Sequence, residues 1–246
     1  MHLTILTGAS RGLGHAVAEQ LLARGHSVLA LSRRAPALKV PPGAALQHWA
    51  VDLAHAAPVA ERLHAWLASQ DSGRLSSATL INNAGVVSQL APLSAVASDD
   101  LVNALRVGLE APTLLTAAFL RATEDWTVPR KVLLVSSGLG RRAMAGSASY
   151  CAVKAGLDHL ARAVALEEAA KAHGARIVSL APGVIDTDMQ VQLRTSSATL
   201  FPERARFVEL KETGQLDSPA TAAAKLLSYL GRANFGSQPV ADVRDA

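Results

Sequence analysis

The chain has 246 residues, a formal net charge of +4 and 50% hydrophobic residues, a composition typical of one globular α/β domain and unlike that of a disordered chain. Its single cysteine, Cys151, excludes an intrachain disulfide framework and a multi-cysteine zinc site, and is typical of a reducing compartment. Aromatic residues make up only 4% of the chain, too few for the stacking platforms that bind single-stranded nucleic acid, so we expect a generic basic surface and no nucleic-acid partner.

No stretch of about 18 residues is apolar throughout, so we expect no membrane span. The first residues run directly into a glycine-rich turn at Thr7 and Gly8, without the basic region, apolar region and cleavage site of a signal peptide. We therefore expect a cytoplasmic protein. The histidines do not have the spacing of metal ligands, so we expect no metal.

Short apolar runs alternate with helical patterns along the chain. In the first half, strands are expected over 3–6, 27–31, 46–51 and 78–81, with helices over 13–24 and 59–67. In the second half, strands are expected over 131–135, 176–180 and near Val240, with helices over 149–173, 203–210 and 219–230 and one over 99–121 interrupted at Gly108 and Pro112. Continuous apolar strands between helices indicate a parallel sheet with both faces covered. We predict a single-domain, doubly wound, Rossmann-like α/β fold over residues 1–246.

Polar or glycine-containing clusters follow the predicted strands. They are Thr7-Gly8, Ser32-Arg33-Arg34, Asp52, Asn82-Asn83, Ser136-Ser137 and Pro182-Gly183. Doubly wound sheets bind their ligands at the carboxyl ends of the strands. These clusters therefore predict one ligand site along that edge.

A glycine-rich segment joins the first strand to the first helix. Glycines at this place let the backbone turn tightly and approach a pyrophosphate, which the helix N-terminus attracts. The expected cofactor contacts are Gly8, Ser10, Arg11, Gly12, Leu13 and Gly14. The spacing is wider than in the common G-x-G-x-x-G pattern, and a tight turn without a ligand is the alternative.

The end of the second strand indicates which dinucleotide would bind. A site for NAD usually has an acidic residue there, which holds the ribose hydroxyls. This chain has Ser32, Arg33 and Arg34 instead, whose hydroxyl and guanidinium donors suit a 2′-phosphate, and Arg11 is expected to approach the same phosphate. The sequence favours NADP(H), with two solvated surface arginines as the alternative.

Tyr150 and Lys154 lie four residues apart on a predicted helix and therefore share a face. A phenol has an ordinary pKa near 10, and a neighbouring ammonium is expected to lower it. Ser137, at the end of the preceding strand, can hydrogen-bond a substrate oxygen. The three residues are candidates for acid–base catalysis.

In their order and spacing, these motifs resemble the short-chain dehydrogenase/reductase family over nearly the whole chain. The motifs that carry the resemblance are Thr7 to Gly14, Asp52, Asn82 to Gly85, Ser137, Tyr150-x-x-x-Lys154 and Pro182 to Thr187. More narrowly, the chain is similar to the bacterial benzil reductase and sepiapterin reductase-like branch of that family. The stretches that carry this similarity are 80–85, 150–158, 179–189 and 212–214.

The resemblance implies NADPH-dependent reduction of a ketone or diketone. Tyr150 would donate the proton, Ser137 would orient the carbonyl, and Lys154 would hold the nicotinamide ribose beside Tyr150. Further cofactor contacts implied are Asp52, Leu53, Asn83, Ala84, Gly85, Pro182, Gly183, Val184 and Thr187. The family assembles through the two long helices that flank the catalytic strand, so a homodimer or homotetramer is expected.

The chain departs from the family pattern at Gly108, which stands where the family commonly has an Asn. In the family, the main-chain carbonyl of this Asn holds a water that links the catalytic lysine to solvent. Because Pro112 lacks an N–H, an α-helix cannot satisfy the Gly108 carbonyl. We therefore expect a retained but altered proton relay through the Gly108 backbone.

The polar segment 187–216 is the expected substrate lid. Its Met189, Leu193 and Phe201, together with Leu139, are expected to line an apolar substrate pocket.

Two other functions stay open at this point. A 3-oxoacyl-carrier-protein reductase is one, because Arg141 and Arg142 could attract an acidic carrier protein. A non-catalytic NADP(H)-binding regulator is the other, and Gly108 is its support.

Overall fold

The computed structural model describes residues 1–245, and a seven-stranded parallel sheet forms its centre. The strand order is β3-β2-β1-β4-β5-β6-β7, so the chain begins in the middle of the sheet and winds outward in both directions. This order confirms the predicted doubly wound, Rossmann-like α/β fold. The strands are β1 (His2–Thr7), β2 (Ser27–Ser32), β3 (Ala45–Ala50), β4 (Ser77–Asn82), β5 (Arg130–Val135), β6 (Arg176–Ala181) and β7 (Val240–Asp242).

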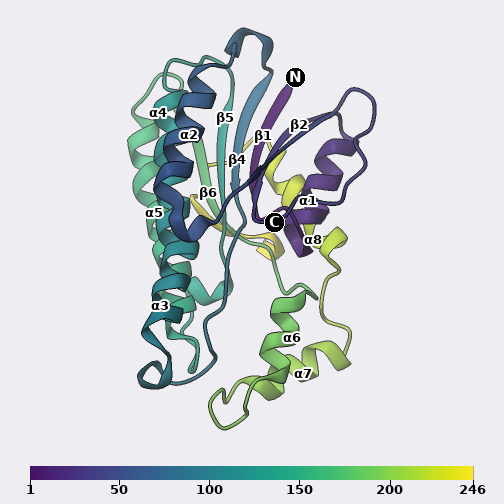
Figure 1. Ribbon diagram of the computed structural model, residues 1–246, viewed down its shortest axis with the longest axis vertical. Helices are drawn as coiled ribbons and strands as arrows, with labels where there is room; N and C mark the ends of the chain where they lie inside the picture. The colour runs from purple at the N-terminus through teal and green to yellow at the C-terminus, as the bar shows by residue number, and fades with distance from the viewer. Residues whose placement is uncertain (246) are drawn as a thin grey trace.

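Helices cover both faces of this sheet. They are α1 (Gly12–Ala23), α2 (Ala56–Ala68), α3 (Ser98–Leu105), α4 (Ala111–Ala122), α5 (Ala148–Ala169), α6 (Asp188–Thr195), α7 (Arg204–Glu212) and α8 (Pro219–Leu230). Helices α2, α4 and α5 lie on one face, and α1 and α8 lie on the other (Figure 1). Helices α6 and α7 lie apart from both layers, beyond the carboxyl edge of the sheet (Figure 1).

The strands form because their residues are apolar on both sides of the pleat. Successive side chains of a strand point to opposite faces, and β5 shows the consequence. Its Val132 and Leu134 pack with α2, α4 and α5, whereas Leu133 and Val135 pack with α1 and α8. All four side chains are at most 7% exposed, so the sheet holds the carboxyl ends of its strands in fixed positions.

The helix predicted over 99–121 is interrupted at Gly108 as expected, but by a wider helical turn and not by a break in the chain's helical path. Between α3 and α4 the chain passes through a π-helical turn, Arg106–Glu110. In this turn the Ala111 N–H donates to the Arg106 carbonyl, one residue further back than in an α-helix. The wider turn accommodates Pro112 while the helical path continues.

Two other segments differ from the prediction. Helix α5 ends at Ala169 instead of His173, because the buried Glu168 accepts a 2.8 Å hydrogen bond from the Ala175 N–H and draws the chain back toward β6. The segment 187–216 holds α6 in addition to α7, which corresponds to the helix predicted over 203–210.

None of the helices within residues 1–245 is long and apolar enough to cross a membrane. The same residues contain no group of three or more His, Cys, Asp or Glu side chains that could hold a metal ion.

Candidate active site

The glycine-rich turn between β1 and α1 is held at very short backbone distances. Gly8 and Gly12 have φ angles of +72° and +55°, which L side chains rarely adopt. A Cβ atom on Gly14 would overlap the carbonyl oxygen of Gly8 and lie 2.5 Å from the Asn83 Nδ2 atom. These three glycines are therefore required by the geometry of the turn.

The end of β4 fixes this turn from the other side. The Asn83 side-chain amide donates to the Thr7 carbonyl at 3.0 Å and to the Gly8 carbonyl at 3.2 Å. The Thr7 hydroxyl oxygen accepts from the Asn83 and Ala84 backbone N–H groups, both at 2.9 Å. Asn83 thus acts on the shape of the turn, and a direct contact with a cofactor is a separate expectation.

The first turn of α1 is arranged like an anion site. Arg11 is its N-cap residue, and within the described chain no side chain hydrogen-bonds the free N–H groups of that turn. Such unpaired N–H groups attract phosphate. The residues present therefore fit the pyrophosphate of a dinucleotide.

A cavity of about 870 Å³ runs along the carboxyl edge from this turn to α5 and the segment 187–216. The predicted cofactor residues that line it are Gly8, Ser10, Arg11, Gly12, Leu13, Gly14, Ser32, Arg33, Asp52, Leu53, Asn83, Ala84, Gly85, Pro182, Gly183, Val184 and Thr187. The predicted catalytic and substrate-pocket residues that line it are Ser137, Tyr150, Lys154, Leu139, Met189 and Leu193. Arg34, Gly108 and Phe201 do not line the cavity.

The two arginines after β2 differ in position. Arg33 lines the cavity, whereas Arg34 lies outside it, and the Arg34 carbonyl accepts a 2.8 Å hydrogen bond from the Ser32 hydroxyl. Ser32 therefore shapes the bend after the strand. Of the two arginines, Arg33 is therefore the one in a position to contact a ligand in the cavity.

Two further cofactor candidates already have partners. The Arg11 guanidinium forms a 2.8 Å ion pair with Asp188 at the start of α6, across the mouth of the cavity, so its side chain is directed toward the segment 187–216. Asp52 accepts a 3.0 Å hydrogen bond from the Ala54 N–H and caps the short 3-10 helix Leu53–His55. The second oxygen of Asp52 is the one left for a ligand.

Ser137, Tyr150 and Lys154 come together at the other end of the cavity. Ser137 follows β5, and its hydroxyl lies close enough to Tyr150, on the first turn of α5, to influence the pKa of the phenol. The Lys154 Nζ atom donates to the Val135 carbonyl at 2.7 Å and lies 5.4 Å from the centre of the Tyr150 ring. The strand and the helix thus place a hydroxyl, a phenol and an ammonium around one point.

Burial determines the acidity of this group. It raises the pKa of the Tyr150 phenol to about 12, against a smaller lowering by the hydrogen bond with Ser137. Burial also lowers the pKa of the Lys154 ammonium to about 8, although the negative charge of Asp158 acts to raise it. The expectation that Lys154 brings the Tyr150 pKa below 10 is wrong for this arrangement, because loss of hydration disfavours both charged forms.

Gly108 is buried in the π-helical turn and does not line the cavity, although its neighbour Val107 does. A Cβ atom at this position would lie 2.6 Å from Cγ1 of Val153, the neighbour of Lys154. Glycine is therefore needed here because Val153 fills the space that a side chain would take. An Asn at this position would require Val153 to move or to be replaced by a smaller residue.

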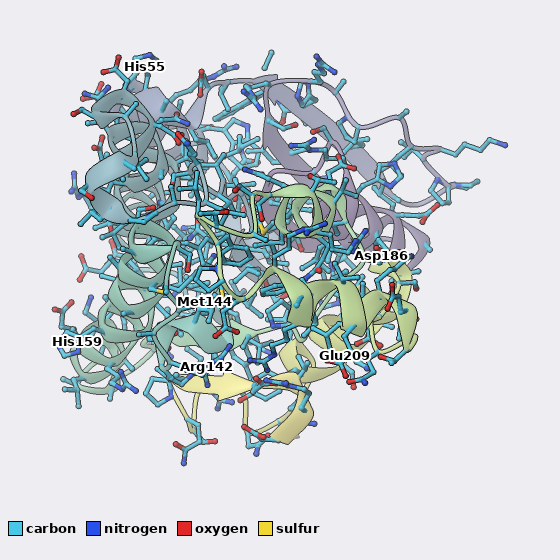
Figure 2. The ribbon with its side chains drawn as sticks, turned by 90° about the horizontal axis from the view of Figure 1, so that it is seen from below. His55, Arg142, Met144, His159, Asp186 and Glu209 are labelled. Atoms are coloured by element: carbon cyan, nitrogen blue, oxygen red, sulfur yellow. The ribbon has the colours of Figure 1, made fainter. Side chains whose placement is uncertain are left out.

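Several apolar side chains line the end of the cavity beside Tyr150. Besides Leu139, Met189 and Leu193, the cavity is lined by Met144 and Phe207, which the sequence reasoning missed. Figure 2 looks onto this edge of the sheet and shows Met144 near its centre, with Arg142 on the same side. The position of Met144 between Ser137 and Tyr150 was the signal that could have identified it.

Phe201 lies beneath this wall. It is fully buried in a cluster with Leu90, Met144 and Leu193, and its ring stacks on Phe207 with 5.7 Å between the ring centres. Phe201 therefore supports the residues that face the cavity and does not face it.

Gln190 is a polar side chain in the same wall that the sequence reasoning also missed. It lies on α6, lines the cavity and is only 6% exposed. Among residues 1–245, its amide oxygen has no hydrogen-bond partner. A buried amide of this kind is costly unless a bound molecule satisfies it.

Comparison with known proteins gives consistent matches. A family model described as short chain dehydrogenase matches residues 2–198. A benzil reductase ((S)-benzoin forming) from Bacillus subtilis is 38% identical over 94% of this chain and 93% of its own. Rat sepiapterin reductase (Rattus norvegicus) is 34% identical over 98% of this chain and 95% of its own. A metagenomic short-chain oxidoreductase solved in complex with NADP has a TM-score of 0.72 and 26% identity, covering 98% of this chain and 94% of that one.

Proposed function

Since this chain belongs to the short chain dehydrogenase family, we propose that it is an NADPH-dependent reductase of a ketone or diketone with apolar or aromatic substituents. The family match and the named relatives confirm the resemblance of the motifs and make the chain an oxidoreductase with a nicotinamide cofactor. The observation that carries the proposal is one cavity with the glycine turn and Arg33 at one end and Ser137, Tyr150 and Lys154 at the other.

The cofactor end supports NADPH over NADH. The uncapped N-terminus of α1 would hold the pyrophosphate, and Arg33 would pair with the 2′-phosphate. The position after β2 has no carboxylate that could hold the free ribose hydroxyls of NADH. Further contacts would come from Asp52 and Leu53 with the adenine, and from Val184 and Thr187 with the nicotinamide carboxamide.

When bound, the reduced nicotinamide supplies a hydride for the carbonyl carbon. The Ser137 hydroxyl would donate a hydrogen bond to the carbonyl oxygen and hold it beside Tyr150. The Tyr150 phenol would give its proton to that oxygen, and with a pKa of about 12 the phenol is fully protonated at neutral pH. Lys154 would hold the nicotinamide ribose, and the Gly108 carbonyl would support the return of a proton from solvent.

The substrate end supports a large, mostly apolar carbonyl compound. Met144, Met189, Leu193 and Phe207 provide the apolar wall, and the Gln190 amide would bind one polar group beside the reacting carbonyl. The Bacillus subtilis relative is named for a diketone, benzil. The segment 187–216 would close over such a substrate as a lid within the same domain.

We also propose a cytoplasmic homodimer or homotetramer. Apolar side chains stand exposed on two helices beside the catalytic strand, Leu105 at 43% on α3 and Leu166 at 77% on α5. A second copy of the chain would cover them. Light scattering on the purified protein decides between monomer, dimer and tetramer.

The test mixes the purified protein with NADPH or NADH and a panel of diketones, pteridines and 3-oxoacyl thioesters, and measures the loss of absorbance of the reduced cofactor. We expect turnover of a diketone or pteridine with NADPH, slower turnover with NADH, and loss of turnover on Tyr150→Phe. Arg33→Glu should raise the KM for NADPH by about tenfold or more, whereas Arg34→Glu, outside the cavity, is the matched control.

Three results would overturn parts of the proposal. Faster turnover with NADH would refute the role of Arg33. Preference for oxoacyl thioesters would favour the carrier-protein reductase. Tight NADPH binding without turnover of any carbonyl compound would favour a regulator.

A further inference from the structure

Asp158 is a buried carboxylate that the proposed mechanism does not use. It lies on α5, one turn after Lys154, and is 1% exposed. A carboxylate is rarely buried to this degree unless its partners compensate for lost hydration. Its partners all belong to segments that meet at the catalytic group.

One oxygen of this carboxylate binds two strands to α5. The Asp158 Oδ1 atom accepts hydrogen bonds from the Ser136 hydroxyl at 2.6 Å and from the Ser179 hydroxyl at 2.7 Å. Ser136 follows β5 and immediately precedes Ser137, and Ser179 lies on β6. The helix that carries Tyr150 and Lys154 is thereby attached to the strand end that carries Ser137.

The other oxygen faces the turn after Ser137. Within the part of the chain that the structure describes, Oδ2 has no hydrogen-bond partner, and the Arg141 Nε atom lies 3.6 Å from it. A Cβ atom on Gly140 would lie 2.7 Å from Oδ2 and 2.8 Å from the Lys154 carbonyl oxygen. The turn Gly138–Gly140 therefore packs directly on the carboxylate and on the helix beside Lys154.

The charge of Asp158 also acts on Lys154. Burial lowers the pKa of Lys154 and the negative charge of Asp158 raises it. The other charged or titratable groups that face this pair are Tyr150 on α5 and Arg141 from the turn. Ser136 and Ser179, from β5 and β6, do not titrate in this range.

We propose that Asp158 is a positioning residue that fixes Ser137 relative to Tyr150 and Lys154 and whose negative charge keeps Lys154 in its ammonium form. This inference rests on the proposed function, because the roles of the three catalytic residues are assigned there. It adds a residue that acts through Ser136 and Lys154 and does not contact the substrate.

The test compares Asp158→Asn with Ser179→Ala. The Asn keeps an acceptor oxygen for both serines and loses the charge, so the alkaline limb of kcat/KM should move to lower pH by about one unit, roughly tenfold in rate on that limb. Ser179→Ala keeps the charge of Asp158 and its hydrogen bond with Ser136, so the alkaline limb of kcat/KM should stay at the wild-type pH in this variant. An Asp158→Asn enzyme with the wild-type pH profile and kcat would overturn the proposal, even if its melting temperature were lower.

A second readout does not depend on turnover. The titration of the Lys154 side chain is followed by NMR of labelled lysine, with the signal assigned from its absence in Lys154→Met. Its midpoint should fall in Asp158→Asn and stay unchanged in Ser179→Ala, and an equal midpoint in both variants would refute the role of the charge. If the protein reduced none of the carbonyl compounds, the proposed function would fail while this measurement still tested Asp158.

Should Asp158→Asn fail to fold, two serine variants decide the positioning role. Ser136→Ala should lower kcat more than Ser179→Ala does, because Ser136 adjoins Ser137. Equal losses of kcat in the two variants would overturn that role.

Discussion

The two ends of the cavity are built in different ways. At the cofactor end, the glycine turn is locked by backbone contacts and by four hydrogen bonds between Thr7, Gly8 and the Asn83-Ala84 segment. At the substrate end, α7 has no fully buried residue. Exposed ion pairs such as Arg11 with Asp188 and Lys211 with Asp186 connect the lid segment to its surroundings.

This difference follows the different demands of the two ligands. The cofactor is the same molecule in every turnover, so a rigid cradle preorganised for it needs no later adjustment. The segment 187–216, the proposed lid, is held by exposed charges and one small apolar cluster, and segments with so few buried contacts are the ones that open and close in other proteins. Substitutions in this proposed lid can also change which substrate binds without disturbing the sheet.

The largest effect is expected for Gly14→Ala in the cradle. The added Cβ would overlap the Gly8 carbonyl, which should cost about 3 kcal/mol of unfolding free energy and lower the melting temperature by about 6–12 °C. Gly231→Ala is the control, because its Cβ would meet its nearest atom at an ordinary 3.4 Å. Calorimetry of both variants and NADPH titration check this, and a wild-type melting temperature for Gly14→Ala would show that the turn is not rigid.

A smaller and local effect is expected for Phe201→Ala in the lid. Truncating a buried Phe costs about 3–5 kcal/mol where the whole fold depends on it, but Phe201 supports only the lid cluster. The KM for the carbonyl substrate should rise and proteolysis within 187–216 should accelerate, with little change in the main melting transition. Phe235→Ala, in the core beside α8, should lower the main melting temperature and leave the KM for the carbonyl substrate unchanged. An equal fall in melting temperature in the two variants would mean that the segment 187–216 and the core unfold together.

The smallest effect is expected for Lys211→Met. The Lys211 ammonium lies 2.6 Å from Asp186, and both side chains are at least one-third exposed, so water and salt screen the pair. The hydrogen bond and charge of Lys211 lower the pKa of Asp186 below 3.8, so any contribution of the pair is present at neutral pH and lost as the pH falls through that lowered value.

For this variant we expect an unchanged melting temperature at neutral pH. The KM for the carbonyl substrate should change by less than about twofold, a change that added salt removes. Lys171→Met, which breaks an ion pair with Glu168 near the start of β6, should leave KM unchanged. A large KM change for Lys211→Met in high salt would show that Lys211 touches the substrate.

Much of the site could be predicted because its residues follow strands or share one helix face. The carboxyl ends of parallel strands meet at one edge, so Gly8, Ser32, Asn83 and Ser137 had to lie along one line. Tyr150 and Lys154 had to share a face because they are four residues apart in a helix. Where a residue lies in a long polar loop, no such periodicity exists, and the prediction was less accurate there. Phe201 was expected to face the cavity, and Phe207 does so instead.

The sequence by itself determined the family and the doubly wound sheet and predicted the catalytic group, because these depend on local periodicity and on fixed motif spacing. The tertiary structure decided which of two adjacent arginines faces the cavity, that Arg11 pairs with Asp188, and that Val153 requires a glycine at position 108. It also decided that burial, and not the neighbouring ammonium, sets the pKa of Tyr150. All of these depend on contacts between residues far apart in the chain or on the degree of burial, and neither is encoded in the local pattern of residues.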